Sequence, residues 1–93
     1  NDLNSDKTPQ KNKIDKTFSY SIKIADFYYR DTAVLMLKKI KKELSIKKLI
    51  IIELSKTKYR LLIGPFNDIK SLQENFDKMN KFNFENLEVL KNV

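Results

Sequence analysis

The sequence predicts a single α+β domain whose strands and helices follow one another in the order β-α-β-β-α-β. Four short stretches are apolar or alternate between apolar and polar residues, and two longer ones repeat apolar residues at helical spacing. The only glycine of the chain lies in the string Gly64-Pro65-Phe66, between a predicted strand and a predicted helix. A weaker copy, Ala25-Asp26-Phe27, lies in the same position of the first half. The chain is therefore interpreted as two β-α-β units.

Two β-α-β units in this order form the split arrangement of ferredoxin-like and RNA-recognition-like (RNP-like) domains. Right-handed crossovers give a four-stranded antiparallel sheet with strand order 4-1-3-2 and with both helices on one face. The first and third strands become central neighbours. The opposite face of the sheet is expected to stay open.

The first 17 residues are predicted to be a disordered polar linker, so the folded domain is expected over 18–93. Residues 1–17 are rich in Asn, Lys and Asp and contain no aromatic side chain. Such a segment buries too little apolar surface to offset the entropy lost on ordering. It contains no apolar signal-peptide core. We expect it to trail from an upstream domain of the same polypeptide.

The first half is predicted to contain a strand over 18–25 and a helix after it. Alternation turns Tyr20, Ile22 and Ile24 toward the core. Asp31 or Thr32 is expected to cap the helix. Lysines cover much of the outer surface of this helix. Its apolar stripe is predicted to consist of Ala33, Met36, Leu37, Ile40 and Leu44.

The second half is predicted to contain a hairpin, a helix and a last strand. The hairpin strands are expected over 49–54 and 59–63, and the last strand over 84–90. Asn67 or Asp68 is expected to cap the helix. The inner stripe of this helix is predicted to be Ile69, Leu72, Phe76 and Met79.

The Gly64-Pro65-Phe66 string is predicted to be a structural turn. Glycine is expected where φ is positive or where another part of the backbone approaches closely. Pro65 lacks an N–H and is expected to end the ladder of the preceding strand. Phe66 is expected to turn inward over the end of the core.

The composition argues against an enzyme. The chain contains neither cysteine nor histidine, which excludes a thiolate nucleophile, a Cys/His zinc site and an imidazole base from this segment. The carboxylates are scattered, without a close pair at strand ends. We therefore expect no catalytic residue, no metal and no cofactor.

The net charge of +7 has two interpretations. The first 17 residues contribute +1, so residues 18–93 carry +6. This excess favours an anionic partner such as nucleic acid, an acidic lipid or an acidic polymer. The alternative is that the lysines of the first helix form an ordinary solvated face.

The string Tyr59-Arg60 followed by Gly64-Pro65-Phe66, together with Phe27 and Ala33 in the first half, resembles the SPOR domain family. The resemblance covers nearly all of the predicted domain. It implies an RNP-like fold that binds peptidoglycan, with a preference for glycan strands stripped of stem peptides. It also implies a place in the periplasm or cell envelope, at the division septum, as part of a larger envelope protein.

The same resemblance implies a glycan site on the open sheet face that includes the positions of Lys23, Asp26 and Arg60. The family commonly has Gln at the position of Lys23, and Gly followed by a small residue at the positions of Ala25 and Asp26. A lysine can donate hydrogen bonds to sugar hydroxyls but cannot accept them.

Strand alternation predicts the rest of the open face. In the strand 49–54, Ile50, Ile52 and Leu54 are expected to face the core, and Leu49, Ile51 and Glu53 the open side. An apolar patch rimmed by hydrogen-bond donors is typical of a binding surface. The predicted glycan-binding residues are Ser21, Lys23, Asp26, Arg60 and Leu62.

Three alternatives stay open. An RNA-binding module of the same topology would need exposed aromatic residues on the central strands. A protein-binding or dimerisation domain would use the apolar part of the face. Arg60 could also be a structural cross-strand partner of Glu53.

Overall fold

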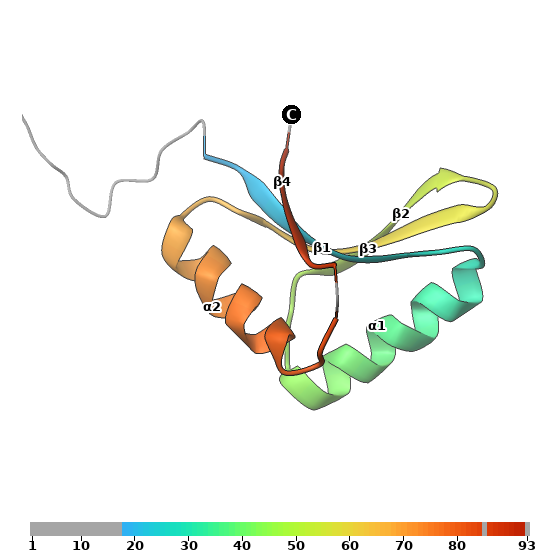
Figure 1. Cartoon of the computed structure of the whole chain (residues 1–93), viewed down its shortest axis with the longest axis horizontal. Helices are drawn as coiled ribbons and strands as arrows, with labels where there is room; N and C mark the ends of the chain where they lie inside the picture. The colour runs from blue at the N-terminus through green and yellow to red at the C-terminus, as the bar shows by residue number, and fades with distance from the viewer. Residues whose placement is uncertain (1–17, 85, 93) are drawn as a thin grey trace, which may run out of the picture.

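The computed structural model describes residues 18–84 and 86–92 (Figure 1). The predicted linker, 1–17, lies outside the described residues. The order of elements is the predicted one. The elements are β1 (Tyr20–Phe27), α1 (Arg30–Leu44), β2 (Leu49–Ser55), β3 (Lys58–Phe66), α2 (Ile69–Asn80) and β4 (Glu88–Lys91).

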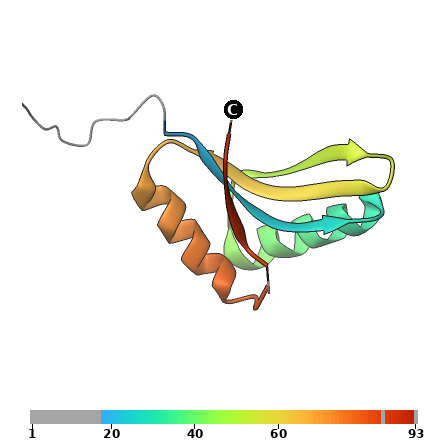
Figure 2. The ribbon, with the colours of Figure 1, turned by 45° about the horizontal axis from the view of Figure 1, so that its top comes forward.

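The four strands form one antiparallel sheet in the order β2-β3-β1-β4. Read from the β4 edge, this is the predicted order 4-1-3-2. Both helices lie against the same face of the sheet, and the described residues add no further layer on the other face (Figures 1 and 2). The α+β fold and the open face expected from the sequence are therefore present.

The core lies between the sheet and the two helices. Ala33 and Ile40 of α1 and Leu72 and Met79 of α2 are buried, as their helical spacing predicts. The prediction for Ile69 is wrong, because its side chain is 67% exposed. Ile69 begins α2 and lines an open surface cavity together with Val89 of the edge strand β4, and no further layer of the described residues covers it.

The two helix starts differ in their caps. Asp68 caps α2, and its side chain accepts a hydrogen bond of 2.8 Å from the backbone N–H of Ser71, as one of the two predicted alternatives requires. The cap predicted for α1 is wrong, because Tyr29 is the N-cap and makes no side-chain hydrogen bond there. The helix begins at Arg30, before Asp31, so the N-cap position falls on Tyr29 and not on Asp31 or Thr32.

Gly64 has the conformation that the sequence predicts, with φ of +137°. A Cβ atom on Gly64 would lie 2.7 Å from Ser21 Oγ and 3.1 Å from Ser21 Cα on β1. The position therefore requires glycine both for its backbone angle and for the close approach of β1. Phe66 is buried in the core, as predicted.

The expectation that Pro65 ends the ladder of its strand is wrong. β3 continues to Phe66, and its pairing with β1 shifts by one residue between Ile63 and Phe66. Pro65 falls in the irregular part of the ladder, where a missing N–H is tolerated. The strand thus runs through Gly64-Pro65, with the irregularity confined to its pairing with β1.

Candidate functional site

The open face of the sheet is the candidate site. Residues opposite one another in the ladders share a face, so they form rows across the strands. One row crosses all four strands, and the next crosses β2, β3 and β1. The first row is Ile50, Leu62, Lys23 and Glu88, and the second is Ile52, Arg60 and Asp26.

A bulge in β1 brings two charged residues of this face together. In a regular strand, residues three apart point to opposite faces. The pairing of β1 with β3 shifts between Lys23 and Ala25, so Ile24 is an extra residue on β1. Ile24 is buried in the core, and both Lys23 and Asp26 reach the open face, where Lys23 Nζ lies 3.6 Å from Asp26 Oδ2.

The predicted orientation of β2 is wrong. Leu49 and Ile51 pair with the core residues Ile63 and Leu61 and pack against the core, so Ile50 and Ile52 face the open side. The cause is a register shift between Glu53 and Ser55, next to the hairpin turn. An extra residue there turns the side chains that precede it in β2, including Leu49–Ile52, to the face opposite the one expected from regular pairing out of the turn.

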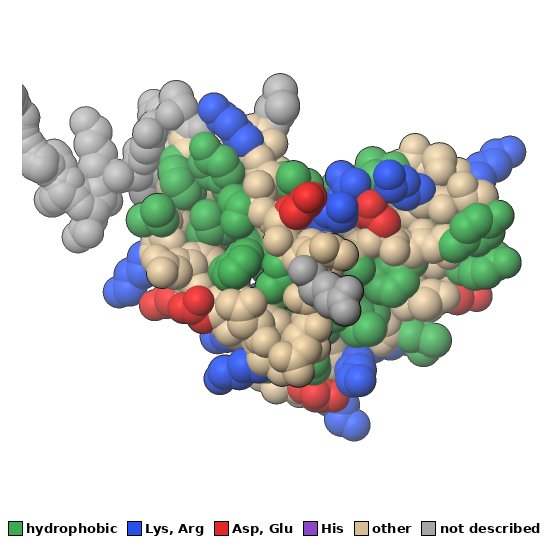
Figure 3. Space-filling view, viewed as in Figure 1, with side chains coloured by type: hydrophobic (Ala, Val, Ile, Leu, Met, Phe, Trp, Pro, Cys, Tyr) green, Lys and Arg blue, Asp and Glu red, His purple; other side chains and the backbone are tan. Residues whose placement is uncertain are grey.

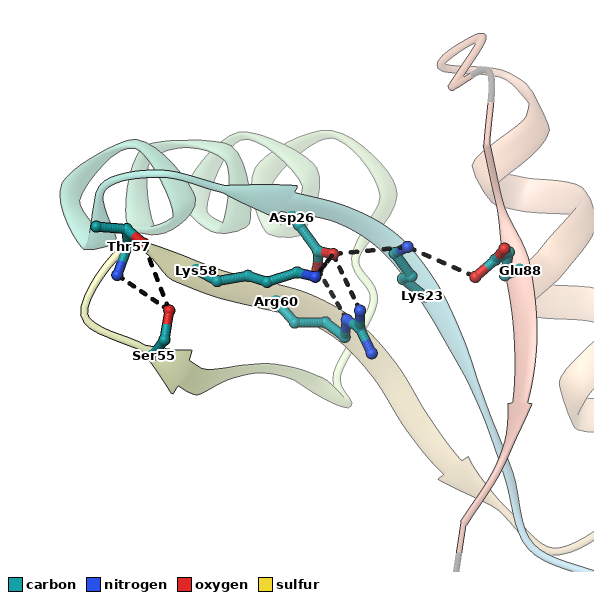
Figure 4. Close-up of polar contacts among 7 residues, drawn as sticks. All are labelled: Lys23, Asp26, Ser55, Thr57, Lys58, Arg60 and Glu88. Carbon is teal, nitrogen blue, oxygen red and sulfur yellow. Dashed lines mark hydrogen bonds and ion pairs between the residues drawn. The ribbon is translucent and has the colours of Figure 1, made fainter.

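The same shift removes the predicted pairing of Arg60 with Glu53. Across the ladders, Arg60 lies opposite Ile52 on β2 and Asp26 on β1. Its guanidinium makes a two-point contact with Asp26, with 2.8 Å from Nε to Oδ1 and 3.0 Å from Nη2 to Oδ2 (Figure 4). Arg60 is thus a cross-strand partner, but the carboxylate that it pairs with belongs to Asp26 on β1 and not to Glu53 on β2.

Two lysines complete a charged cluster, here defined as Lys23, Asp26, Lys58, Arg60 and Glu88. Lys58 Nζ lies 3.8 Å from Asp26 Oδ2, and Lys23 Nζ lies 3.5 Å from Glu88 Oε1 (Figure 4). Three cations surround two carboxylates, so the charged cluster carries one excess positive charge. In Figure 3 basic and acidic side chains meet along the upper edge of the molecule, where Figure 1 places the sheet.

The charged cluster shifts the proton affinities of its central pair. The hydrogen bond from Arg60 lowers the pKa of Asp26 below its ordinary 3.8, and the nearby charges of Lys23 and Lys58 act in the same direction. The hydrogen bond to Asp26 raises the pKa of Arg60 above its ordinary value. Both groups are therefore charged at neutral pH.

An aliphatic strip, here defined as Ile50, Ile52 and Leu62, borders the charged cluster on the β2 side. Ile50 and Ile52 expose 40% and 39% of their surface, whereas Leu62 exposes only 6% between its neighbours. The open face thus changes from aliphatic at β2 to charged at β1 and β4. Leu62 contributes mainly to the floor of the face.

Ser21 does not reach solvent. It is 3% exposed, and its hydroxyl donates a hydrogen bond of 3.1 Å to the side-chain oxygen of Asn92. Gly64 lies directly against it. Of the five predicted site residues, the structure brings Lys23, Asp26, Arg60 and Leu62 together on the open face and places Ser21 beneath it.

A cavity of about 450 Å³ lies beside the charged cluster. β4 pairs only with the first half of β1, so the second half of β1 has no neighbour strand on that side among the described residues. Lys23, Asp26, Asn83 and Asn86 line the cavity. Sequence reasoning missed the two asparagines, although polar residues beside aromatic ones in 82–86 are a signal for a surface turn.

The site offers binding groups. Lysine and arginine donate hydrogen bonds, asparagine both donates and accepts, and isoleucine provides apolar contact. Within 18–84 and 86–92, no group of His, Cys, Asp and Glu side chains is arranged to hold a metal ion. In the same residues, no helix has the length and apolarity needed to cross a membrane.

Comparison of the chain with models of protein families, with curated proteins and with solved structures found no match.

Proposed function

We propose that this chain is a non-catalytic domain that binds peptidoglycan through its open sheet face. The observation that carries the proposal is the position of the aliphatic strip directly beside the charged cluster on an uncovered face. An apolar surface bordered by hydrogen-bond donors is typical of a binding site.

A glycan strand matches both parts of this face. The C–H faces of sugar rings would lie on Ile50 and Ile52, and their hydroxyl groups would accept hydrogen bonds from Lys23 and Arg60. Arg60 uses two of its five N–H groups on Asp26, which leaves others for a ligand. The cavity beside β1 would add the side-chain amides of two asparagines.

The excess positive charge supports a preference for strands stripped of stem peptides. Cleavage of the amide between glycan and peptide leaves a carboxylate on the sugar. Lysine and arginine side chains form charge-assisted hydrogen bonds with such a carboxylate. We therefore propose denuded glycan strands as the ligand, in agreement with the SPOR resemblance of the sequence.

This ligand implies a cellular role. Denuded strands accumulate where a dividing bacterium separates its septal wall, so the domain would direct a larger envelope protein to the septum. The upstream part of the same polypeptide would supply any activity. The proposed location is the periplasm or cell envelope.

Nucleic acid is a weaker candidate. RNA-binding modules of this topology stack bases on aromatic side chains of the central strands. Here the described side chains of the open face include no aromatic residue. A shallow dependence of affinity on salt would distinguish the glycan from a polynucleotide, whose binding weakens steeply as salt rises.

Co-sedimentation with purified sacculi tests the proposal. We expect the domain to pellet with sacculi and to pellet more strongly after an amidase has removed the stem peptides. Absence of pelleting from both preparations, together with a mass that rises with concentration, would favour a dimerisation domain instead.

Two variants test the role of Arg60 in this assay. Arg60→Ala should weaken the affinity for amidase-treated sacculi about tenfold, since it removes charged hydrogen-bond donors worth roughly 1.5 kcal/mol. The matched control, Arg30→Ala, removes an exposed arginine at the start of α1 and should bind like the wild type. If the wild type, Arg60→Ala and Arg30→Ala bind equally well, Arg60 does not contribute to glycan binding.

A further inference from the structure

A second candidate site lies at the junction of α1, β2 and α2, away from the open face. A cavity of about 310 Å³ opens there between the α1–β2 connection and α2. Its floor includes Ile46 and Phe66, which are nearly buried. Its polar lining consists of Ser45, Lys47, Lys48, Ser71, Asn75 and Lys78.

The lining of this cavity is basic. Three of its side chains are lysines, and neither an aspartate nor a glutamate lines it. Lys48 is held in place, because its Nζ donates a hydrogen bond of 3.0 Å to the carbonyl of Pro65 and lies 5.5 Å from the centre of the Phe66 ring. The nearby acidic residue Asp68 is occupied as the cap of α2.

The cavity also lies at the end of the most positive part of the chain. Six of the eleven residues from 38 to 48 are lysine, and one is glutamate. This segment carries +5 of the +6 found in residues 18–93. All six lysines are exposed, and none makes an ion pair with another described residue. Such a concentration of charge attracts anions.

We propose that this cavity binds the phosphate group of a small phosphate ester. Lysine ammonium groups bind phosphate oxygens as point charges, and the hydroxyl of Ser45 adds a hydrogen-bond donor. The Asn75 amide adds the N–H that it does not donate to the Ser71 carbonyl, whereas the Ser71 hydroxyl already donates to Asp68. The volume exceeds what one phosphate group needs and leaves room for part of its organic substituent. The site is separate from the open face, so it does not depend on glycan binding.

An NMR titration of the ¹⁵N-labelled chain with glycerol 3-phosphate tests the proposal. Saturable shifts are expected in Ser45–Lys48 and in Ser71, Asn75 and Lys78. Glycerol with sodium chloride at the same ionic strength should not produce them. A titration without saturation, or shifts centred on the open face, would overturn the proposal.

Two double variants with equal charge loss make the test specific. Lys47→Gln with Lys78→Gln should raise the Kd for glycerol 3-phosphate at least tenfold. Lys38→Gln with Lys39→Gln, on α1 outside the cavity, should change it less than twofold. Equal weakening by both pairs would mean a diffuse charged surface and would contradict the proposal.

Two further probes distinguish the source of the phosphate. Vesicles that contain phosphatidylglycerol present phosphate groups on a lipid surface. A single-stranded oligonucleotide presents them along a polymer. If either binds and both double variants weaken it equally, the six lysines act as a face for a polyanion, and a small-ligand site is ruled out. If the cavity variants do not fold, the NMR titration of the wild-type chain still tests the proposal, because saturable shifts must then be centred on the residues that line the cavity.

Discussion

Asp26 forms ion pairs with three cations of the open face, and Arg60 holds it by two hydrogen bonds. The side chain of Asp26 is only 21% exposed, so these contacts are partly shielded from water. A partly buried carboxylate with several cationic neighbours is stabilised in its charged form. Asp26 therefore fixes the donors of the open face as well as neutralising part of their charge.

The lowered pKa of Asp26 predicts a pH dependence of stability. A carboxyl whose pKa is lower in the folded chain stabilises the fold above its ordinary value, 3.8, and this stabilisation is lost as pH falls through the native pKa. Asp26→Asn should lower stability at pH 7 by about 1–2 kcal/mol. The difference in Tm between wild type and variant should shrink below pH 4.

Thermal unfolding followed at several pH values measures this effect. Asp77→Asn is the matched control, because Asp77 is exposed on α2 and belongs to none of the ion pairs of the charged cluster. A Tm difference for Asp26→Asn that stays constant from pH 7 to pH 2 would contradict the role assigned to the carboxylate.

Gly64→Ala is expected to destabilise the domain by about 2 kcal/mol or more. An alanine at φ of +137° is strained, and its Cβ would lie 3.1 Å from Ser21 Cα. Urea denaturation measures the loss. Adding Ser21→Gly removes the contact with the hydroxyl but leaves the backbone strain, so the double variant should recover only part of the stability. Full recovery would show that the backbone angle is unimportant.

β2 shows how one extra residue decides which side chains reach the open face. The register shift between Glu53 and Ser55 turns Ile50 and Ile52 outward and Leu49 and Ile51 inward. The run of aliphatic residues 49–52 has no polar residue to mark a face, so both orientations fit its composition. The pairing with β3 selects one of them.

Adjacent isoleucines on β2 provide a direct check of this orientation. Ile51→Ser should cost about 2 kcal/mol or more, because Ile51 packs against the core. Ile50→Ser should cost well under 1 kcal/mol, because Ile50 is 40% exposed on the open face. Urea denaturation of the two variants measures both values. A larger loss of stability for Ile50→Ser than for Ile51→Ser would contradict this orientation and support the one expected from simple alternation.

The sequence pattern predicted the order of elements, the strand order and the uncovered face, because these follow from periodicity and crossover handedness. It did not predict the partner of Arg60 or the outward side of β2. Those depend on bulges at Ile24 and near Leu54, and neither position carries a glycine or proline to mark it. The irregularity at Gly64-Pro65 contains both a glycine and a proline, and there the positive φ of Gly64 was predicted.

The domain as a whole presents two surfaces of different chemistry. The open face combines the aliphatic strip with a charged cluster that is nearly neutral, whereas most of the net charge lies on the segment 38–48 and around the basic cavity. The ligand proposed for the first surface is a glycan strand with carboxylates on its stripped sugars, and the ligand proposed for the second is a phosphate ester. Both could be occupied at once, because they share none of the residues that define them.

Chemical-shift mapping with soluble denuded glycan fragments tests the central claim, that the uncovered side of the sheet receives the ligand. We expect saturable shifts in Lys23, Asp26, Ile50, Ile52 and Arg60, with little change along α1 and α2. Ile52→Ser should weaken this binding several-fold, and the control Leu35→Ser, which alters an exposed leucine of α1, should leave it unchanged. Shifts confined to the helices, or no shifts with any fragment, would contradict the claim.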